Sequence, residues 1–330
     1  MIDPRGAGRP AVVLLLALAG CDVRALDAGN DDPRGLLPVD QRNPVLISND
    51  GCGSWQGLYA VLFASSGGPS LGGIAVNASS YATNLDANHS AWVNLITAAR
   101  ASGLRGLPDP IASDGPPLVR PATGDIAATM PNDSAGARLI VDASSRLASA
   151  SRPLAVLAGG RLTDVADAYL VDSTVADRVV VVAGLGSLSS TGAAMGAPNG
   201  ELDPWADWIV AQRFRYVQVS AFYDETTDIP SQRLASLPQN PLGQLIAAQQ
   251  PNVTNVATQS DQVSVVAVGL PAFASSVTRM SLDPAAAFDP ATGPPLVPDP
   301  GGHIWLVTAI DPAAATARLW QMLGPKTFGS

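Results

Sequence analysis

The stretch LISNDGCGSWQG, residues 46–57, places the carboxylate of Asp50 between a short apolar run and a helix-like segment that starts at Trp55. The turn from a strand into a helix is a common place for a ligand or metal site in α/β proteins. A carboxylate in such a turn can activate water or bind a cation. It can equally cap the following helix by accepting the backbone N–H of Gly53 or Ser54. The residues alone leave both roles of Asp50 open.

Three further residues, Asn77, Gly159 and Gly184, stand in a comparable position, because each lies at the end of an apolar run. Ligands of open α/β sheets bind beyond the carboxyl ends of the strands. We therefore expect these residues to lie with Asp50 along one edge of a sheet.

The elements that would form this edge are short apolar runs, which alternate with segments of helical periodicity. We expect strands at 44–48, 71–78, 152–159, 177–186 and 216–223, and helices at 55–64, 86–102, 162–170 and 204–212. Such apolar strands with helices between them indicate an α/β fold with a mostly parallel, doubly wound (Rossmann-like) sheet and helices on both faces. Segments rich in Gly, Pro and Ser are expected to be long loops at 106–137, 186–200 and 284–302.

The composition narrows the classes of function. The chain has 330 residues, 47% of them apolar, which suits one large domain or two modest ones. Its formal net charge is −9, and it has no basic run interleaved with aromatic residues. Binding of nucleic acid through phosphate contacts is therefore not expected. The sequence leaves the oligomeric state open.

The first 43 residues predict a secreted, lipid-anchored protein. Arg5 and Arg9 precede a short apolar run, which indicates a signal peptide over residues 1–20. The sequence LAGC, ending at Cys21, resembles the lipobox of bacterial lipoproteins, in which the cysteine is lipidated. Residues 21–43 are polar and predict a disordered tether, followed by a folded domain over 44–330. The expected location is the cell envelope, facing the periplasm or exterior; the alternative is an ordinary signal peptide that contains a cysteine.

Several other residues have structural interpretations. Cys52 has no partner once Cys21 is assigned to lipid, and its place between two glycines indicates a tight turn. Asp203-Pro204 predicts a helix N-cap followed by proline at the first helical position. The remaining candidates, which we expect to be packing or structural residues, are Trp205, Trp208, His89 and His303.

From about Pro44 to Gly324 the order of segments resembles the inosine–uridine nucleoside hydrolase family. The similarity rests on six stretches, each of which is the counterpart of a family motif: LISNDGCGSWQG, LGGIAVNASS, RPLAVLAGGRLTDVADAYLVDS, VVVVAGLGS, NGELDPWADWIV and HIWLVTAIDPAAATARLWQML. The resemblance implies a nucleoside hydrolase-like fold. It also implies a Ca²⁺ site at the end of the first strand and cleavage of the N-glycosidic bond of ribonucleosides.

The implied metal site is only partly present. The resemblance places Asp50, the Gly159 carbonyl and Asp261 at the family's calcium ligands. Trp55 stands where the family has a bidentate carboxylate, and an indole offers no oxygen to a cation that takes about six to eight. No cofactor is therefore expected, and Ca²⁺ binding is the alternative.

The ligand-binding residues that the resemblance implies are also only partly present. Ser54 takes the place of a family residue that contacts a sugar hydroxyl, and Asn199 that of the asparagine that contacts ribose. Asn77, at the end of the second strand, is a further ligand-binding candidate. Ser260 replaces the family's leaving-group histidine, and a serine cannot donate a proton as an acid at neutral pH.

Three functions follow from these substitutions. The first is a noncatalytic lipoprotein that binds a nucleoside, a pentose or a similar small ligand. The second is an active but divergent nucleoside N-ribohydrolase, in which Asp50 acts as the base of a rearranged metal site. The third is an envelope structural or interaction module. Loss of one general acid typically lowers a rate by about 10²- to 10⁴-fold, which favours the first.

Overall fold

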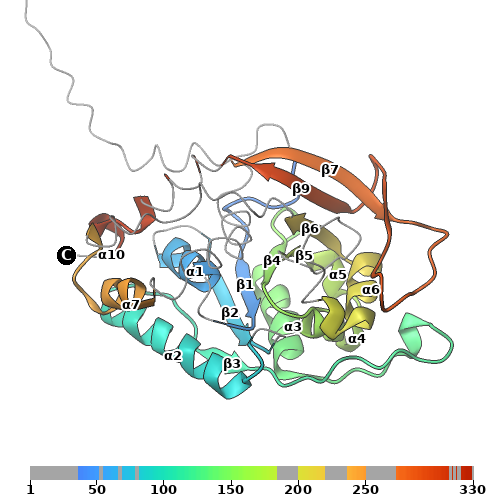
Figure 1. Ribbon diagram of the computed structural model, residues 1–330, viewed down its shortest axis with the longest axis horizontal. Coiled ribbons are helices and arrows are strands. Elements are labelled where there is room, and N and C mark those ends of the chain that lie inside the picture. Colours follow the sequence, from blue (N-terminus) through green and yellow to red (C-terminus); the bar gives the residue numbers. More distant parts are fainter. Residues whose placement is uncertain are drawn as a thin grey trace, which may run out of the picture.

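The structure is a computed structural model, which describes residues 36–51, 55–65, 69–78, 82–183, 200–219, 236–249, 273–311, 314, 317 and 321–328. It contains a nine-stranded sheet with the strand order β3-β2-β1-β4-β5-β6-β9-β7-β8 (Figure 1). The strands are β1 (Val45–Asn49), β2 (Leu71–Val76), β3 (Pro110–Ala112), β4 (Leu154–Ala158), β5 (Val179–Ala183), β6 (Arg215–Val219), β7 (Ala274–Leu282), β8 (Leu296–Pro298) and β9 (Ile304–Ile310).

Seven neighbouring strands of this sheet are parallel, and the last two are not. The pairs from β3 to β9 run parallel, whereas β7 is antiparallel to both β9 and β8. The predicted mostly parallel α/β sheet is thus confirmed. The antiparallel hairpin was not predicted, because the exposed side of β7 is rich in Ser and Thr and carries no continuous apolar run.

Helices cover both faces of the sheet, as predicted. They are α1 (Trp55–Ser65), α2 (Leu85–Ala101), η2 (Ile126–Ala128), α3 (Ala135–Leu147), α4 (Thr163–Val171), α5 (Val175–Arg178), η4 (Gly200–Leu202), α6 (Pro204–Arg213), α7 (Pro241–Gln249) and α10 (Pro325–Phe328). The predicted 106–137 loop overruns the start of α3 and contains the short strand β3. No helix in the described ranges is long and apolar enough to cross a bilayer.

Alternating side chains of β1 divide the core into two parts. Val45 and Ile47 pack in a cluster with α1, α2 and α7, whereas Leu46 packs in a second cluster with α3, α4 and α6. Side chains of successive strand residues point to opposite faces of a sheet, so both faces of this strand need cover. The buried apolar runs of the sequence are therefore explained by a sheet between two helical layers.

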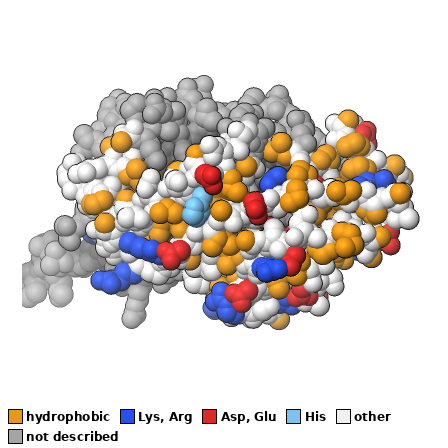
Figure 2. All heavy atoms as spheres, turned by 90° about the horizontal axis from the view of Figure 1, so that it is seen from below, with side chains coloured by type: hydrophobic (Ala, Val, Ile, Leu, Met, Phe, Trp, Pro, Cys, Tyr) orange, Lys and Arg blue, Asp and Glu red, His pale blue; other side chains and the backbone are white. Residues whose placement is uncertain are grey.

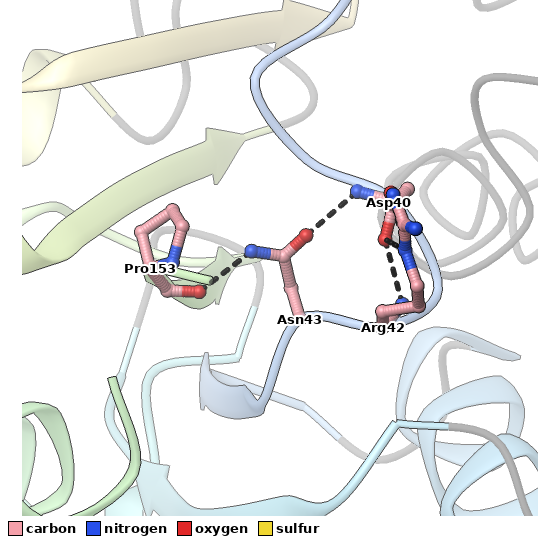
Figure 3. Close-up of polar contacts among 4 residues, drawn as sticks. All are labelled: Asp40, Arg42, Asn43 and Pro153. Carbon is pink, nitrogen blue, oxygen red and sulfur yellow. Dashed lines mark hydrogen bonds and ion pairs between the residues drawn. The ribbon is translucent and has the colours of Figure 1, made fainter. Parts of the chain in front are cut away.

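The folded body begins before Pro44. The Nδ2 of Asn43 donates a hydrogen bond of 2.7 Å to the backbone oxygen of Pro153, and its Oδ1 accepts one of 2.8 Å from the backbone N–H of Asp40 (Figure 3). Asn43 is buried, as is Val39. Residues 36–43 were predicted to be part of the tether, but this turn ties them to the residue that precedes β4. The rest of the predicted tether lies outside the described residues.

Candidate functional site

The ends of β1, β2 and β4 meet, and they bring together three of the predicted site residues. The backbone N–H of Asn77 donates to the Asn49 oxygen at 2.9 Å, and that of Gly159 donates to the Ser48 oxygen at 2.9 Å. Each of these bonds continues the parallel ladder one residue past the strands. Asp50, Asn77 and Gly159 therefore lie side by side at the carboxyl edge of the sheet.

Gly160 shows how closely these segments approach. A Cβ added to Gly160 would lie 2.4 Å from Oδ1 of Asn77 and 3.3 Å from Cβ of Asp50. The first distance is below any normal carbon–oxygen contact, so only glycine fits without movement of a neighbour. The backbone of the β4–α4 turn is thus in contact with both predicted polar side chains.

The Asn77 side chain is held in place by hydrogen bonds, but one of its polar atoms has no partner. Its Nδ2 donates to Oγ of Ser48 at 3.2 Å, and the Asn88 side chain donates to the Asn77 backbone oxygen at 3.0 Å. The side chain is 1% exposed, yet Oδ1 has no hydrogen-bond partner. A buried carbonyl oxygen without a donor is costly and is usually satisfied by water or a ligand.

Asp50 lies next to this amide and is partly exposed. Its Oδ1 accepts the backbone N–H of Gly51 at 2.7 Å. Whether it also caps α1 depends on Gly53 and Ser54, which lie outside the described residues. Both sequence interpretations of Asp50 therefore stand as predictions.

The described residues supply only part of the predicted calcium site. Asp50 provides one carboxylate and Gly159 one backbone carbonyl at this edge, and Trp55 is the first residue of α1. Within the described ranges, no group of three or more His, Cys, Asp or Glu side chains is arranged to hold a metal ion. These described residues alone do not make a calcium site.

Four other predicted functional residues lie outside the described ranges: Ser54, Asn199, Asp261 and Cys21. The same holds for Cys52, Gly184 and Ser260. Their predicted roles in binding, metal ligation or lipidation remain predictions.

Asp164, at the start of α4, was not predicted as a site residue. It is 2% exposed, and its Oδ1 accepts the hydroxyl of Ser113 at 2.6 Å and that of Ser134 at 3.0 Å. Burial raises the pKa of the Asp164 carboxyl, although the two hydroxyls, the Asn77 amide and the charge of Arg161 lower it. Asp164 thereby links the ends of β2 and β3 and the start of α3.

A pair of buried carboxyl groups, Asp203 and Asp207, lies at the start of α6. Asp203 caps this helix by accepting the Ala206 N–H at 3.0 Å, and its other oxygen accepts the Thr163 hydroxyl at 2.6 Å. Burial raises the pKa of Asp203. Burial, together with the nearby negative charge of Asp203, raises the pKa of Asp207 well above its ordinary value. Oδ1 of Asp207 has no hydrogen-bond partner.

The predicted structural roles outside the site are largely confirmed. Asp203 is the N-cap of α6 with Pro204 in the first turn. Trp205 and Trp208 are 2% and 7% exposed and pack in the core, so they form no open stacking platform. The ring Nε2 of His89 contacts the Pro110 carbonyl at 3.0 Å, and that of His303 contacts the Ala211 carbonyl at 2.8 Å.

Residues 113–134, which we call the arm, leave the same sheet edge after β3 and return to α3. Buried carboxylates hold the arm at both ends. Asp203 accepts the Leu118 N–H at 2.9 Å, and Asp167 of α4 accepts the N–H groups of Asn132 and Ser134, both at 2.8 Å. Arg161 donates to the Gly115 oxygen at 2.6 Å. Figure 1 shows the arm as a long excursion at the lower right.

Comparison with solved structures identifies the fold as that of the nucleoside hydrolases. An inosine-guanosine nucleoside hydrolase matches with a TM-score of 0.64 at 15% identity, over 86% of this chain and 98% of that one. An inosine-uridine preferring nucleoside hydrolase from Bacillus anthracis matches with a TM-score of 0.60 at 13% identity, over 85% and 99%.

A third solved structure, described as an effector protein, matches with a TM-score of 0.56 at 14% identity, over 92% of this chain and 97% of that one. No protein-family model matches the chain, and no curated protein matches its sequence. At these identities the similarity shows the fold alone. The predicted nucleoside hydrolase-like fold is thus confirmed, whereas activity has to be argued from the site.

Proposed function

We propose that this protein binds the sugar of a nucleoside, or a free pentose, at the carboxyl edge of β1, β2 and β4 without hydrolysing it. The observation that carries the proposal is the buried, unpartnered Oδ1 of Asn77, beside Gly160 and Asp50. A carbonyl and a carboxylate together accept hydrogen bonds from vicinal hydroxyls, which is what a pentose offers. The place is the one where ligands of open α/β folds bind.

The residues at two positions of the family's site disfavour hydrolysis. Cleavage of a glycosidic bond needs a base to activate water and an acid to protonate the leaving group. Asp50 can serve as the base, but the acid position is Ser260 and the bidentate metal position is Trp55. Water that is not bound to a metal keeps its high pKa, so a single carboxylate activates it poorly.

The second candidate is a divergent nucleoside N-ribohydrolase with a rearranged metal site. It is favoured by the fold, which two nucleoside hydrolases share over almost their whole length. The third, an interaction module without a ligand, remains open because the same fold occurs in a structure described only as an effector protein. Fold alone does not decide among them.

Binding and turnover can be measured separately on the full chain. We expect ribose or inosine to raise the melting temperature of the wild type, and Asn77→Ala to weaken binding about tenfold or more, which corresponds to about 1.4 kcal/mol. Asp50→Asn, which preserves shape, should weaken it as well. Asn94→Ala, on the exposed side of α2, is the matched control.

Each outcome selects one function. Release of reducing sugar from inosine that depends on Asp50 and on added Ca²⁺ would establish the hydrolase and refute our proposal. If no nucleoside or pentose shifts the melting temperature, the third function, an interaction module without a ligand, is favoured. A shift without sugar release is the result we expect.

We further propose that Cys21 anchors the protein to a membrane of the cell envelope through lipid. The support is the LAGC sequence after a short apolar run. In a bacterial host, radiolabelled palmitate should enter the wild type but not Cys21→Ala, and the variant should move to the soluble fraction. Labelling of both proteins, or of neither, would contradict the anchor.

A further inference from the structure

Asp164 is a buried acid without an ion pair, unlike several exposed acids of the protein. Figure 2 shows acidic and basic side chains side by side on one face of the molecule. Asp164 is 2% exposed, and within the described ranges it forms no ion pair, although Arg161 lies near enough for its charge to lower the pKa of the carboxyl. A carboxyl that is held in such a place is a candidate for a functional role.

The two hydroxyl groups that donate to Asp164 are themselves fixed. Oγ of Ser113 accepts the backbone N–H of Gly136 at 3.0 Å, and Oγ of Ser134 accepts that of Ala137 at 3.2 Å. Because each oxygen already accepts a backbone N–H, its own hydrogen is directed to Oδ1 of Asp164, at 2.6 and 3.0 Å. The end of β3 and the start of α3 thus determine where the carboxyl lies.

The first turn of α3 leaves room for this carboxyl only because residue 136 is glycine. A Cβ added to Gly136 would lie 2.5 Å from Cγ and 2.6 Å from Oδ2 of Asp164. Glycine inside a helix costs about 0.5–1 kcal/mol relative to alanine. The helix therefore has a poorer helix former at the point where it approaches the carboxyl most closely.

The Asn77 amide connects this carboxyl to the candidate site. The amide lowers the pKa of Asp164, which only its N–H end can do, because a carbonyl oxygen beside a carboxylate would raise that pKa. The same end donates from Nδ2 to Oγ of Ser48 at 3.2 Å. Oδ1, at the other end of the amide, lies against Gly160 and has no hydrogen-bond partner.

Of the two neighbours of Nδ2, only Asp164 can select this orientation of the amide. A serine hydroxyl both donates and accepts, so Ser48 could bind either end of Asn77. A carboxylate is an acceptor only. A half-turn of the amide would bring Oδ1 of Asn77 against the carboxylate of Asp164, and two acceptors repel each other.

We propose that Asp164 is a positioning residue of the sugar site, because it holds the Asn77 amide with Oδ1 toward the ligand and so makes the site select a ligand group that donates a hydrogen bond. This inference rests on the proposed function and adds to it the residue that decides which end of the amide the ligand meets. Without the carboxylate the amide can turn and present Nδ2, and the site then accepts a group that cannot donate.

The first test needs no ligand. The side-chain amide signal of Asn77 can be identified in a ¹H–¹⁵N spectrum of the full chain as the signal that Asn77→Ala removes. Asp164→Asn should move this signal, because the amide loses its carboxylate acceptor. The variant should fold, since its one side-chain oxygen can still accept both serine hydroxyls. Asp207→Asn, which replaces another buried acid, is the matched control and should leave the signal in place.

The second test measures selectivity with inosine and its 2′-fluoro and 3′-fluoro analogues of ribo configuration. Fluorine is close in size to a hydroxyl group but cannot donate a hydrogen bond. We expect the wild type to bind one analogue about tenfold or more weakly than inosine, and Asn77→Ala to remove that penalty. Asp164→Asn should reduce the same penalty to less than about threefold, whereas Asp207→Asn should retain it. A merely structural role of Asp164 would weaken all three ligands alike.

Four results would overturn the proposal. One is an Asn77 amide signal that Asp164→Asn leaves unchanged, whether or not a sugar binds. Another is a wild type that binds inosine and both fluoro analogues equally. The third is a penalty that Asp164→Asn retains in full, and the fourth is one that Ser48→Ala alone removes, which would assign the orientation to Ser48. Absence of any binding by the wild type would instead refute the sugar site, and the amide signal would still show whether Asp164 orients Asn77.

Discussion

A methyl group at Gly160 is the smallest change that tests the geometry of the candidate pocket. In Gly160→Ala the new Cβ would lie 2.4 Å from Oδ1 of Asn77, whereas real Cβ atoms essentially never approach within 3.0 Å of another heavy atom. The Asn77 amide cannot simply withdraw, because Ser48 accepts from its Nδ2 and Asn49 holds its backbone. Overpacking of this kind costs about 1–3 kcal/mol.

Urea unfolding of Gly160→Ala is therefore expected to show a free energy of unfolding lower by about 1–3 kcal/mol, with an unchanged m-value. Gly301→Ala is the control, since its Cβ would meet only Oδ1 of Asp299, at an ordinary 3.4 Å. Replacing glycine where the backbone permits it is neutral or stabilises by up to about 1 kcal/mol.

The same variant addresses binding, because the added methyl group would displace the one carbonyl that we assign to the ligand. Ribose or inosine should bind at least tenfold more weakly to Gly160→Ala than to the wild type or Gly301→Ala. If Gly160→Ala is as stable as the wild type and binds equally well, the close approach of the β4–α4 turn to Asn77 is refuted.

The buried carboxyl groups give three further predictions. Because the pKa of Asp207 is raised, the native state retains a proton that the unfolded chain releases. The free energy of unfolding therefore falls by up to about 1.4 kcal/mol per pH unit as the pH rises above about 4. Thermal unfolding of Asp207→Asn should show higher stability at pH 7 and a flatter decline between pH 4 and 7; a lower melting temperature at pH 7 would contradict this. Asp203→Asn should instead be less stable at pH 7 by about 1–3 kcal/mol in urea, because an amide has a single acceptor oxygen, whereas both oxygens of the Asp203 carboxylate accept hydrogen bonds. Asp167→Ala should lower the free energy of unfolding by about 3–5 kcal/mol, because it leaves three backbone N–H groups without their acceptor. Amide hydrogen exchange at residues 132–134 should become faster; unchanged exchange would show that other contacts hold the arm in place.

Most of the sheet could be predicted from the sequence because its strands are buried on both faces. The short apolar runs around Ile47, Val156 and Val181 favour core strands. β4 and β5 lie within the predicted ranges, and β1 extends one residue past its predicted end. The edge hairpin escaped prediction, because β7 is half exposed and carries Ser, Thr and Arg. The start of α3 was assigned to a loop, since Ser134 caps it within a Gly- and Pro-rich segment.

The convergence of Asp50, Asn77 and Gly159 could also be predicted, because parallel strands end at one edge. The roles of Asp164 and Asp167 could not. In the sequence TDVADAYLV two acids three residues apart suggest an exposed helix face. Their acceptor roles depend on Ser113, Ser134 and the arm backbone, which are remote in the sequence. The one available signal was an acid-bearing helix whose remaining residues are nearly all apolar.

The turn that Asn43 fastens to Pro153 lies at the end of β1 opposite the candidate site. This turn lies at the opening end of β1, and Asp50 lies past its far end, a separation of about 16 Å along a strand of five residues. If lipid at Cys21 holds the chain on a bilayer, the length of chain between Cys21 and this turn sets how far the folded body can stand from the lipid headgroups.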